Sequence, residues 1–285
     1  MGEPVTFLMD NGSLEPAATL RLRELAEDLG RKIGTPVEPV SLLHSSGAPV
    51  AKLGGVPAEI LEPALERRLQ AGQRDFVIVP LFFGPSSALT DYLPKRIAHL
   101  RTKFPKLGVK LAAPLFTKDD DRLALILADH VREGWNALPS TRSERLEGKP
   151  LHLKRVALVD HGSPARVVVE VRNQLAAQLG RALGDGFTVA AGSMERREGA
   201  EYDFCEPLLE RLLTRPGWND GEVIIAMQFL LPGRHAGPEG DVAKICRAAE
   251  EANPALRTRM TPLVGAHPLL VDILADRRRA VLVEV

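Results

Sequence analysis

The sequence predicts an α/β protein made of two pseudo-symmetric lobes, each a small parallel sheet with helices on both faces. Short continuous apolar runs alternate with helix-patterned stretches along the chain. Such runs are typical of parallel strands that are buried on both faces. Segments of the first half also return, in the same order, in the second half. The length of 285 residues suits two domains of ordinary size.

The repeat is clearest in the first strand of each half and in the turn that follows it. Residues 5–13 read Val-Thr-Phe-Leu-Met-Asp-Asn-Gly-Ser, and residues 156–163 read Val-Ala-Leu-Val-Asp-His-Gly-Ser. A helix-patterned stretch follows each turn and contains Leu-Gly-Arg, at 29–31 and again at 179–181. Each half therefore begins with a strand, a glycine turn and a helix.

The later elements repeat in the same way. Glu-Pro-x-Leu-Glu-Arg occurs at 62–67 and at 206–211, and each copy leads into a buried-strand run, at 76–83 and at 223–231. A last strand and a closing helix complete each half. We therefore expect an N-terminal lobe at residues 1–134, a linker rich in Pro, Ser, Arg and Glu at 135–155, and a C-terminal lobe at 156–285.

Composition excludes several classes of protein. Lys+Arg and Asp+Glu are equal, at 37 each, so no net charge attracts the chain to nucleic acid or to an anionic membrane. No apolar stretch approaches the length of a membrane span, and we expect a cytoplasmic protein. Two isolated cysteines support neither a disulfide framework nor a structural zinc site.

The first candidate functional residue is His161, which follows a buried strand directly. Parallel sheets bind ligands beyond the carboxyl ends of their strands, and His161 lies at such an end. Gly162 can adopt a positive φ and allow a ligand close to the backbone, and we expect Ser163 to cap the next helix. A histidine bonded locally in a turn is the alternative interpretation.

The second candidate is His235, in the loop Pro-Gly-Arg-His-Ala-Gly-Pro-Glu-Gly that follows the strand run at 223–231. Its glycines and prolines predict a structured loop that can hold a side chain over a crevice. Gly233 and Arg234 precede the histidine, and Arg234 can contact a substrate carboxylate or remain a solvated loop charge. Asp241 is expected to cap the following helix.

Glu195 closes a third strand-like segment and can add a carboxylate to the same rim, although an exposed loop acid is the simpler alternative. Neutral imidazole is a good ligand for Co²⁺, Fe²⁺, Ni²⁺ and Zn²⁺, and it also titrates near neutral pH. His161 and His235 could therefore deliver a metal and accept protons.

These residues resemble a known family, the class II chelatases of the CbiX type, which insert a divalent metal into sirohydrochlorin. The resemblance rests on the His-Gly-Ser at 161–163, the Phe-Leu-Leu-Pro-Gly-Arg-His at 229–235, and the Pro-Leu-Val-Gly-Ala-His-Pro-Leu-Leu at 262–270. It extends across nearly the whole second half. It implies two flavodoxin-like lobes and a metal-handling, catalytic trio of His161, His235 and Glu195.

The resemblance also implies the partners: a sirohydrochlorin-type tetrapyrrole, contacted by Gly162, Ser163, Gly233 and Arg234, and a divalent metal, Co²⁺, Fe²⁺ or Ni²⁺, as substrate. It implies no organic cofactor, and a monomer or a homodimer is compatible with a duplicated chain. The first half departs from the pattern, because Asn11 stands where His161 stands and His44 falls near the place of Glu195. We expect this lobe to keep the fold without the chemistry.

The functional hypothesis is therefore insertion of Co²⁺ or Fe²⁺ into sirohydrochlorin, in cobalamin or sirohaem biosynthesis. Two alternatives stay open. One is a non-catalytic tetrapyrrole- or metal-binding protein that retains the lobes, which the altered first half allows. The other is an interaction scaffold on the same fold, since a fold alone does not fix a function.

Overall fold

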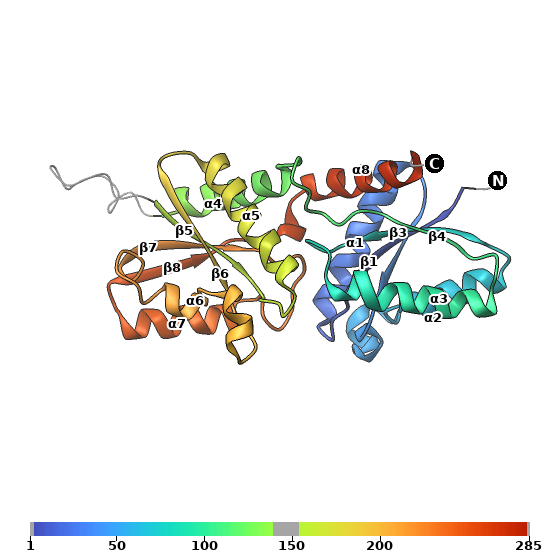
Figure 1. Cartoon of the computed structure of the whole chain (residues 1–285), viewed down its shortest axis with the longest axis horizontal. Helices are drawn as coiled ribbons and strands as arrows, with labels where there is room; N and C mark the ends of the chain where they lie inside the picture. Colours follow the sequence, from blue (N-terminus) through green and yellow to red (C-terminus); the bar gives the residue numbers. More distant parts are fainter. Residues whose placement is uncertain (1–2, 139–153, 284–285) are drawn as a thin grey trace. The chain divides into compact units, whose positions relative to one another are not determined.

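The computed structural model describes residues 3–138 and 154–283, and these form two compact units. Each unit contains one four-stranded, fully parallel sheet. The strand orders are β2-β1-β3-β4 and β6-β5-β7-β8, so the second sheet repeats the topology of the first (Figure 1). The predicted α/β class and the two pseudo-symmetric lobes are confirmed.

The first sheet is most deeply buried at its first and third strands, whereas the last two residues of its fourth strand are exposed. The strands are β1 (Val5–Asp10), β2 (Val37–Ser41), β3 (Asp75–Pro80) and β4 (Gly108–Leu111). Helices α2 (Leu61–Gln70) and α3 (Leu93–Lys103) cover one face, where Phe7 and Phe76 stack with ring centroids 5.9 Å apart. Helix α1 (Pro16–Ile33), which begins with Pro and ends at Gly34 in the left-handed region, contacts β1 and β2.

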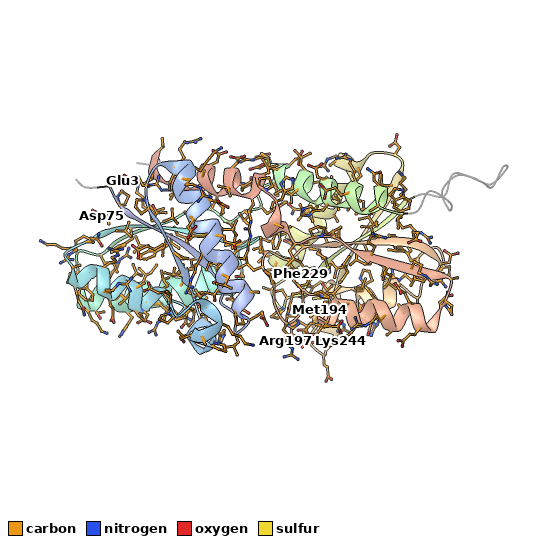
Figure 2. The ribbon with its side chains drawn as sticks, turned by 180° about the vertical axis from the view of Figure 1, so that it is seen from behind. Glu3, Asp75, Met194, Arg197, Phe229 and Lys244 are labelled. Atoms are coloured by element: carbon orange, nitrogen blue, oxygen red, sulfur yellow. The ribbon has the colours of Figure 1, made fainter. Side chains whose placement is uncertain are left out.

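The second sheet has the same plan. Its strands are β5 (Lys154–Asp160), β6 (Phe187–Ser193), β7 (Gly221–Met227) and β8 (Leu256–Met260). Helix α5 (Arg166–Leu183) contacts β5 and β6, while α6 (Leu209–Leu212) and α7 (Asp241–Ala252) cover the face that holds Ala157, Val159 and Ile225. Side chains fill the layers between the sheets and the helices (Figure 2).

The remaining two helices do not follow the sequence repeat. Helix α4 (Arg122–Asn136) belongs to the second unit, where it packs on α5 and β7, and α8 (Leu269–Val283) belongs to the first unit, beside α1 (Figure 1). Buried Arg278 fixes α8 there, because its guanidinium donates to Thr6 Oγ1 at 2.9 Å and to Glu3 Oε1 at 2.9 Å. Glu3 is labelled in Figure 2.

The packing units thus differ from the lobes expected at 1–134 and 156–285. The last helix of each repeat covers the sheet of the other repeat, because its apolar face finds an uncovered sheet face there. Most of the expected linker at 135–155 lies outside the described residues. Within the described residues, no helix combines the length and apolar character that a membrane crossing requires.

The order of the strands in the second sheet determines where the candidate functional residues lie. The central strands of the second sheet, β5 and β7, are neighbours, and the chain crosses to opposite sides of this pair. In open parallel sheets, ligands bind at such a switch point, outside the carboxyl ends of the strands. His161 follows β5 directly, and His235 lies in the loop between β7 and α7.

Candidate functional site

The structure brings His161 and His235 together in the second unit. Their ring centroids are 4.6 Å apart, and the ring planes are inclined at 77°. Each imidazole comes from the carboxyl end of a central strand, so the convergence follows from the pairing of β5 with β7. The side chains are 47% and 30% exposed, respectively, which leaves both rings accessible from solvent.

Hydrogen bonds assign the same tautomer to both rings. His161 Nδ1 lies 3.0 Å from the carbonyl oxygen of Gly162, and His235 Nδ1 lies 2.7 Å from Asp241 Oδ2. Both partners are acceptors, so each Nδ1 carries a hydrogen, and in the neutral form of each ring the lone pair is on Nε2. The pair therefore offers two nitrogen donors that a metal ion or a proton can use.

Glu195 is the third predicted residue, and it lies beside one of the two rings. Its Oε1 is 3.5 Å from His161 Nε2, and its side chain is 60% exposed. Among the described residues, however, no cluster of three or more His, Cys, Asp or Glu side chains is arranged to hold a metal ion. The arrangement is a pair of imidazoles with an adjacent carboxylate, and it is not a preformed resident metal centre.

Asp241 has a role that the sequence did not indicate. Helix α7 begins at Asp241 itself, with Gly240 in the cap position, and the carboxylate bonds His235 instead of the helix end. Lys244 Nζ donates to Asp241 Oδ1 at 3.0 Å, and these bonds from Lys244 and then His235 hold the pKa of Asp241 below its usual range. An anionic carboxylate thus fixes the orientation of the His235 ring.

The residues predicted to contact the substrate differ in their exposure and in the unit to which they belong. The Arg234 side chain is 85% exposed, and its Nε lies 3.7 Å from Asp241 Oδ2. Gly233 belongs to the segment 230–233, which packs with the first unit. Ser163 does not cap α5, because that helix begins at Arg166; its hydroxyl instead accepts the Ala165 amide at 3.1 Å.

Gly162 is required by the geometry of the turn. Its φ is 90°, and a Cβ at this position would lie 1.9 Å from the carbonyl oxygen of Glu195. The Glu195 amide donates to the His161 carbonyl at 3.2 Å, so the two turns are in direct backbone contact. Only glycine permits this approach, which holds Glu195 against His161.

Comparison with known families gives a match in the second half of the chain. Residues 155–281 match the model of the CbiX family. This region of the chain is thus similar to the CbiX family. Its boundaries include the His161 turn, Glu195 and the His235 loop, all of which lie in the second unit. A search of curated proteins gave no match.

Solved structures share the fold over almost the entire chain. SirB from Bacillus subtilis with Fe³⁺ matches with a TM-score of 0.72 at 15% sequence identity, covering 99% of this chain and 96% of that one. The sirohydrochlorin chelatase SirB from Bacillus subtilis subspecies spizizenii, in complex with cobalt, matches with a TM-score of 0.67 at 14% identity, covering 98% and 95%. At this identity the likeness establishes the fold.

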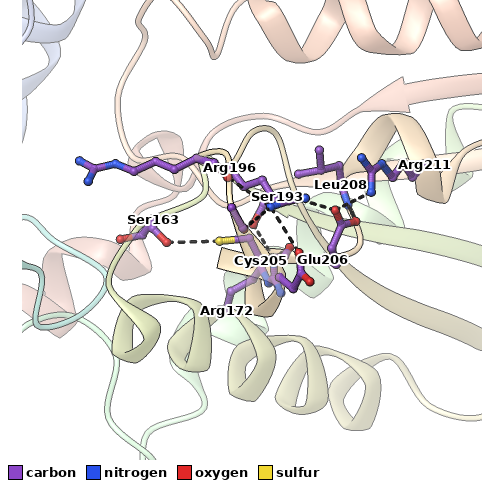
Figure 3. A network of polar contacts seen from close by, with 11 residues as sticks. Ser163, Arg172, Ser193, Arg196, Cys205, Glu206, Leu208 and Arg211 are labelled. Carbon is purple, nitrogen blue, oxygen red and sulfur yellow. Dashed lines mark hydrogen bonds and ion pairs between the residues drawn. The ribbon is translucent and has the colours of Figure 1, made fainter. Parts of the chain in front are cut away.

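A buried polar network joins the residue before His161 to β6 and α5, and Figure 3 shows Arg172 and Ser193 of this network. Asp160 Oδ1 accepts the Gly162 amide at 3.1 Å and the Ser193 hydroxyl at 2.7 Å. Arg172, on α5, donates to Ser193 Oγ and lies 3.8 Å from Asp160 Oδ1. Burial raises the pKa of Asp160, while the charge of Arg172 and the hydrogen bond from Ser193 act in the opposite direction.

The first unit repeats the backbone of this site without its functional groups. The Leu43 amide donates to the Asn11 carbonyl at 3.1 Å, just as Glu195 donates to His161. Leu43, and not the predicted His44, is therefore the counterpart of Glu195. His44 is the next residue and adopts a φ of 65° on the exposed surface. The first unit thus retains the turn but offers neither an imidazole pair nor a carboxylate there.

Proposed function

We propose that this protein inserts a divalent metal, Co²⁺ or Fe²⁺, into sirohydrochlorin. The observation that carries the proposal is the pair of converging imidazoles, His161 and His235, each bonded to an acceptor through Nδ1. The match of residues 155–281 to the CbiX family model supports it, as does a fold shared with a sirohydrochlorin chelatase from Bacillus subtilis. The metal is a substrate that must leave, which agrees with a two-histidine site open to solvent.

The imidazoles serve first as metal ligands. Bare insertion of a hydrated dication is slow because the ion must lose bound water before the macrocycle nitrogens can reach it. Two Nε2 lone pairs replace part of the hydration shell and present the ion to one face of the ring. Asp241 keeps the His235 ring in the tautomer that can do this.

The same residues take up protons. Insertion releases two pyrrole N–H protons, and neutral imidazole is a competent base near neutral pH. Glu195 Oε1, 3.5 Å from His161 Nε2 and exposed to solvent, can receive a proton from the protonated ring and pass it to water. We assign His161, His235 and Glu195 to catalysis and metal handling, with no organic cofactor.

Substrate contact is assigned to residues around the histidines. Arg234, with its guanidinium in solvent, can pair with a carboxylate of the macrocycle, and we assign the Gly162 and Ser163 turn beside His161 to contact with the ring. We place the reaction in cobalamin or sirohaem biosynthesis. First-row dications follow a common order of affinity at nitrogen sites, so the choice between cobalt and iron is left to direct assay.

An insertion assay tests the proposal. Purified protein is mixed with sirohydrochlorin and with Co²⁺, Fe²⁺ or Ni²⁺ in turn, and absorbance follows formation of the metallated ring. His161→Ala and His235→Ala should each reduce insertion to the rate without protein. His99→Ala, an exposed histidine on α3 of the first unit, is the matched control and should keep full activity. Full activity in either site variant contradicts the assignment. Tetrapyrrole binding by the wild type without insertion would instead indicate a binding protein.

A further inference from the structure

Arg172 is a cation in an unusual place. It lies in the middle of α5, and its residue is 1% exposed, which makes it the largest of the fully buried side chains among the described residues. A buried guanidinium loses its hydration, and it is tolerated only where protein groups replace the lost hydrogen bonds. The partners of Arg172 therefore show what the side chain does.

Arg172 Nε and Nη2 donate to Asn173 Oδ1 on the same helix, at 3.1 Å and 2.9 Å, whereas the contacts of Nη1 come from three segments that are far apart in sequence. Arg172 Nη1 donates to Ser193 Oγ at the end of β6 and, at 2.9 Å, to the carbonyl oxygen of Cys205. The same nitrogen lies 3.8 Å from Asp160 Oδ1 at the end of β5. One guanidinium thus holds together the ends of two neighbouring strands and the end of the 196–205 connection (Figure 3).

Two of these strand ends carry the candidate site. Asp160 precedes His161 and accepts the Gly162 amide at 3.1 Å, which sets the direction in which the turn leaves β5. Ser193 precedes Glu195 by two residues, and its hydroxyl bonds Asp160 at 2.7 Å. Cys205 Sγ in turn lies 3.2 Å from the Ser163 carbonyl oxygen. The contacts of Arg172 therefore reach both sides of the turn that presents His161 and Glu195.

The repeated first unit shows that this cation is not needed for the fold. Asp10 and Ser41 pair in β1 and β2 just as Asp160 and Ser193 pair in β5 and β6. Helices α1 and α5 have the same length of 18 residues, and Leu22 occupies the position of Arg172. The guanidinium is thus found only beside the strand end that presents an imidazole.

We propose that Arg172 is a positioning residue that holds the His161 turn and Glu195 in register for metal insertion. The inference rests on the proposed function for its activity readout. Arg172 acts through Asp160, Ser193 and the Cys205 carbonyl, and it does not touch the reacting atoms. Without it, Ser193 Oγ and the Cys205 carbonyl lose a shared donor, Asp160 loses its nearby cation, and the turn gains freedom.

The decisive variant is Arg172→Leu, which copies the residue of the first unit. We expect it to fold and to bind sirohydrochlorin with an unchanged KM, while kcat falls about 10- to 100-fold, as for other residues that orient metal ligands. Arg172→Lys, which keeps the charge but loses the planar fork, should recover part of kcat. Arg181→Leu, with a 66% exposed side chain on the same helix, is the control and should match the wild type.

A second readout does not depend on activity. Amide exchange at Gly162 and Glu195, whose N–H groups donate to Asp160 and to His161, should be faster in Arg172→Leu and unchanged in Arg181→Leu. If the wild type inserts no metal, the proposed function fails and amide exchange alone decides the role of Arg172. Wild-type kcat together with wild-type exchange in Arg172→Leu overturns the inference. If Arg172→Leu does not fold, Ser193→Ala and Arg172→Lys are measured in its place. A wild-type kcat in both of these variants would also overturn the inference.

Discussion

Asp10 tests how a buried carboxyl group that has no arginine beside it changes the stability of the first unit. The residue is 7% exposed, and its Oδ1 has no hydrogen-bond partner among the described residues. Burial raises the pKa of Asp10 from 3.8 to about 6, and bonds from Ser41 and the Gly12 amide only partly offset this effect. Replacing the carboxyl with an amide, as in Asp10→Asn, removes the titration.

The size of the expected change in unfolding free energy follows from the shift in the pKa of Asp10. The difference between the folded and unfolded pKa corresponds to about 3 kcal/mol at 1.36 kcal/mol per unit. Because the folded pKa is raised, the wild type keeps this stability below pH 3.8 and loses it as the pH rises through about 6. About 2 kcal/mol of the loss falls between pH 4 and pH 8.

The assay compares the free energy of unfolding of the wild type and Asp10→Asn in urea at several pH values. Any fixed penalty of the new amide cancels, so the stability of the variant relative to wild type should rise by about 2 kcal/mol from pH 4 to pH 8. Circular dichroism is the better probe, because Trp135 and Trp218 both lie in the second unit. Glu27→Gln, an exposed acid on α1, is the control. A difference that does not change with pH would refute the reasoning.

Two further predictions concern the site. Asp241→Asn keeps an acceptor for His235 Nδ1 but removes the negative charge of the Asp241 side chain. The affinity for Co²⁺, measured by calorimetry, should therefore fall about 10- to 100-fold. An unchanged affinity would show that Asp241 does not support the site. Gly162→Ala and Gly12→Ala place a Cβ at 1.9 Å and 1.6 Å from a carbonyl oxygen, at φ values of 90° and 97°. Each should cost about 1–3 kcal/mol of unfolding free energy, but only Gly162→Ala should also slow insertion, and equal insertion rates in both would contradict the role of this turn.

Much of the fold was predictable because its signals are local. The first and third strands of each half are visible in the sequence as apolar runs, and their recurrence shows that the two halves share one succession of elements. The convergence of His161 and His235 was also predictable, because both follow strands that are central in a sheet of this topology. The sequence shows that an apolar strand run precedes each histidine, and the structure shows that these two strands are neighbours.

Other features depend on tertiary packing that local patterns do not encode. An amphipathic helix shows which of its faces is apolar but not which sheet will cover that face, so the exchange of α4 and α8 between the repeats was missed. Asp241 was expected to cap a helix, since the sequence shows its place at the helix start but not the ring 2.7 Å away. Arg172 sits in a helix where a surface charge is the usual expectation, and only the structure shows its burial.

Comparison of the two units distinguishes the residues that the turn requires from the residues that the site requires. An aspartate at the strand end and a glycine at positive φ occur in both, in Asp10 and Gly12 and in Asp160 and Gly162, so these residues serve the backbone. The imidazoles, Glu195 and Arg172 occur in the second unit alone. Restoring a histidine at Asn11 would thus not create a second site, because the partner ring, the carboxylate and the buried cation would all still be missing from the first unit.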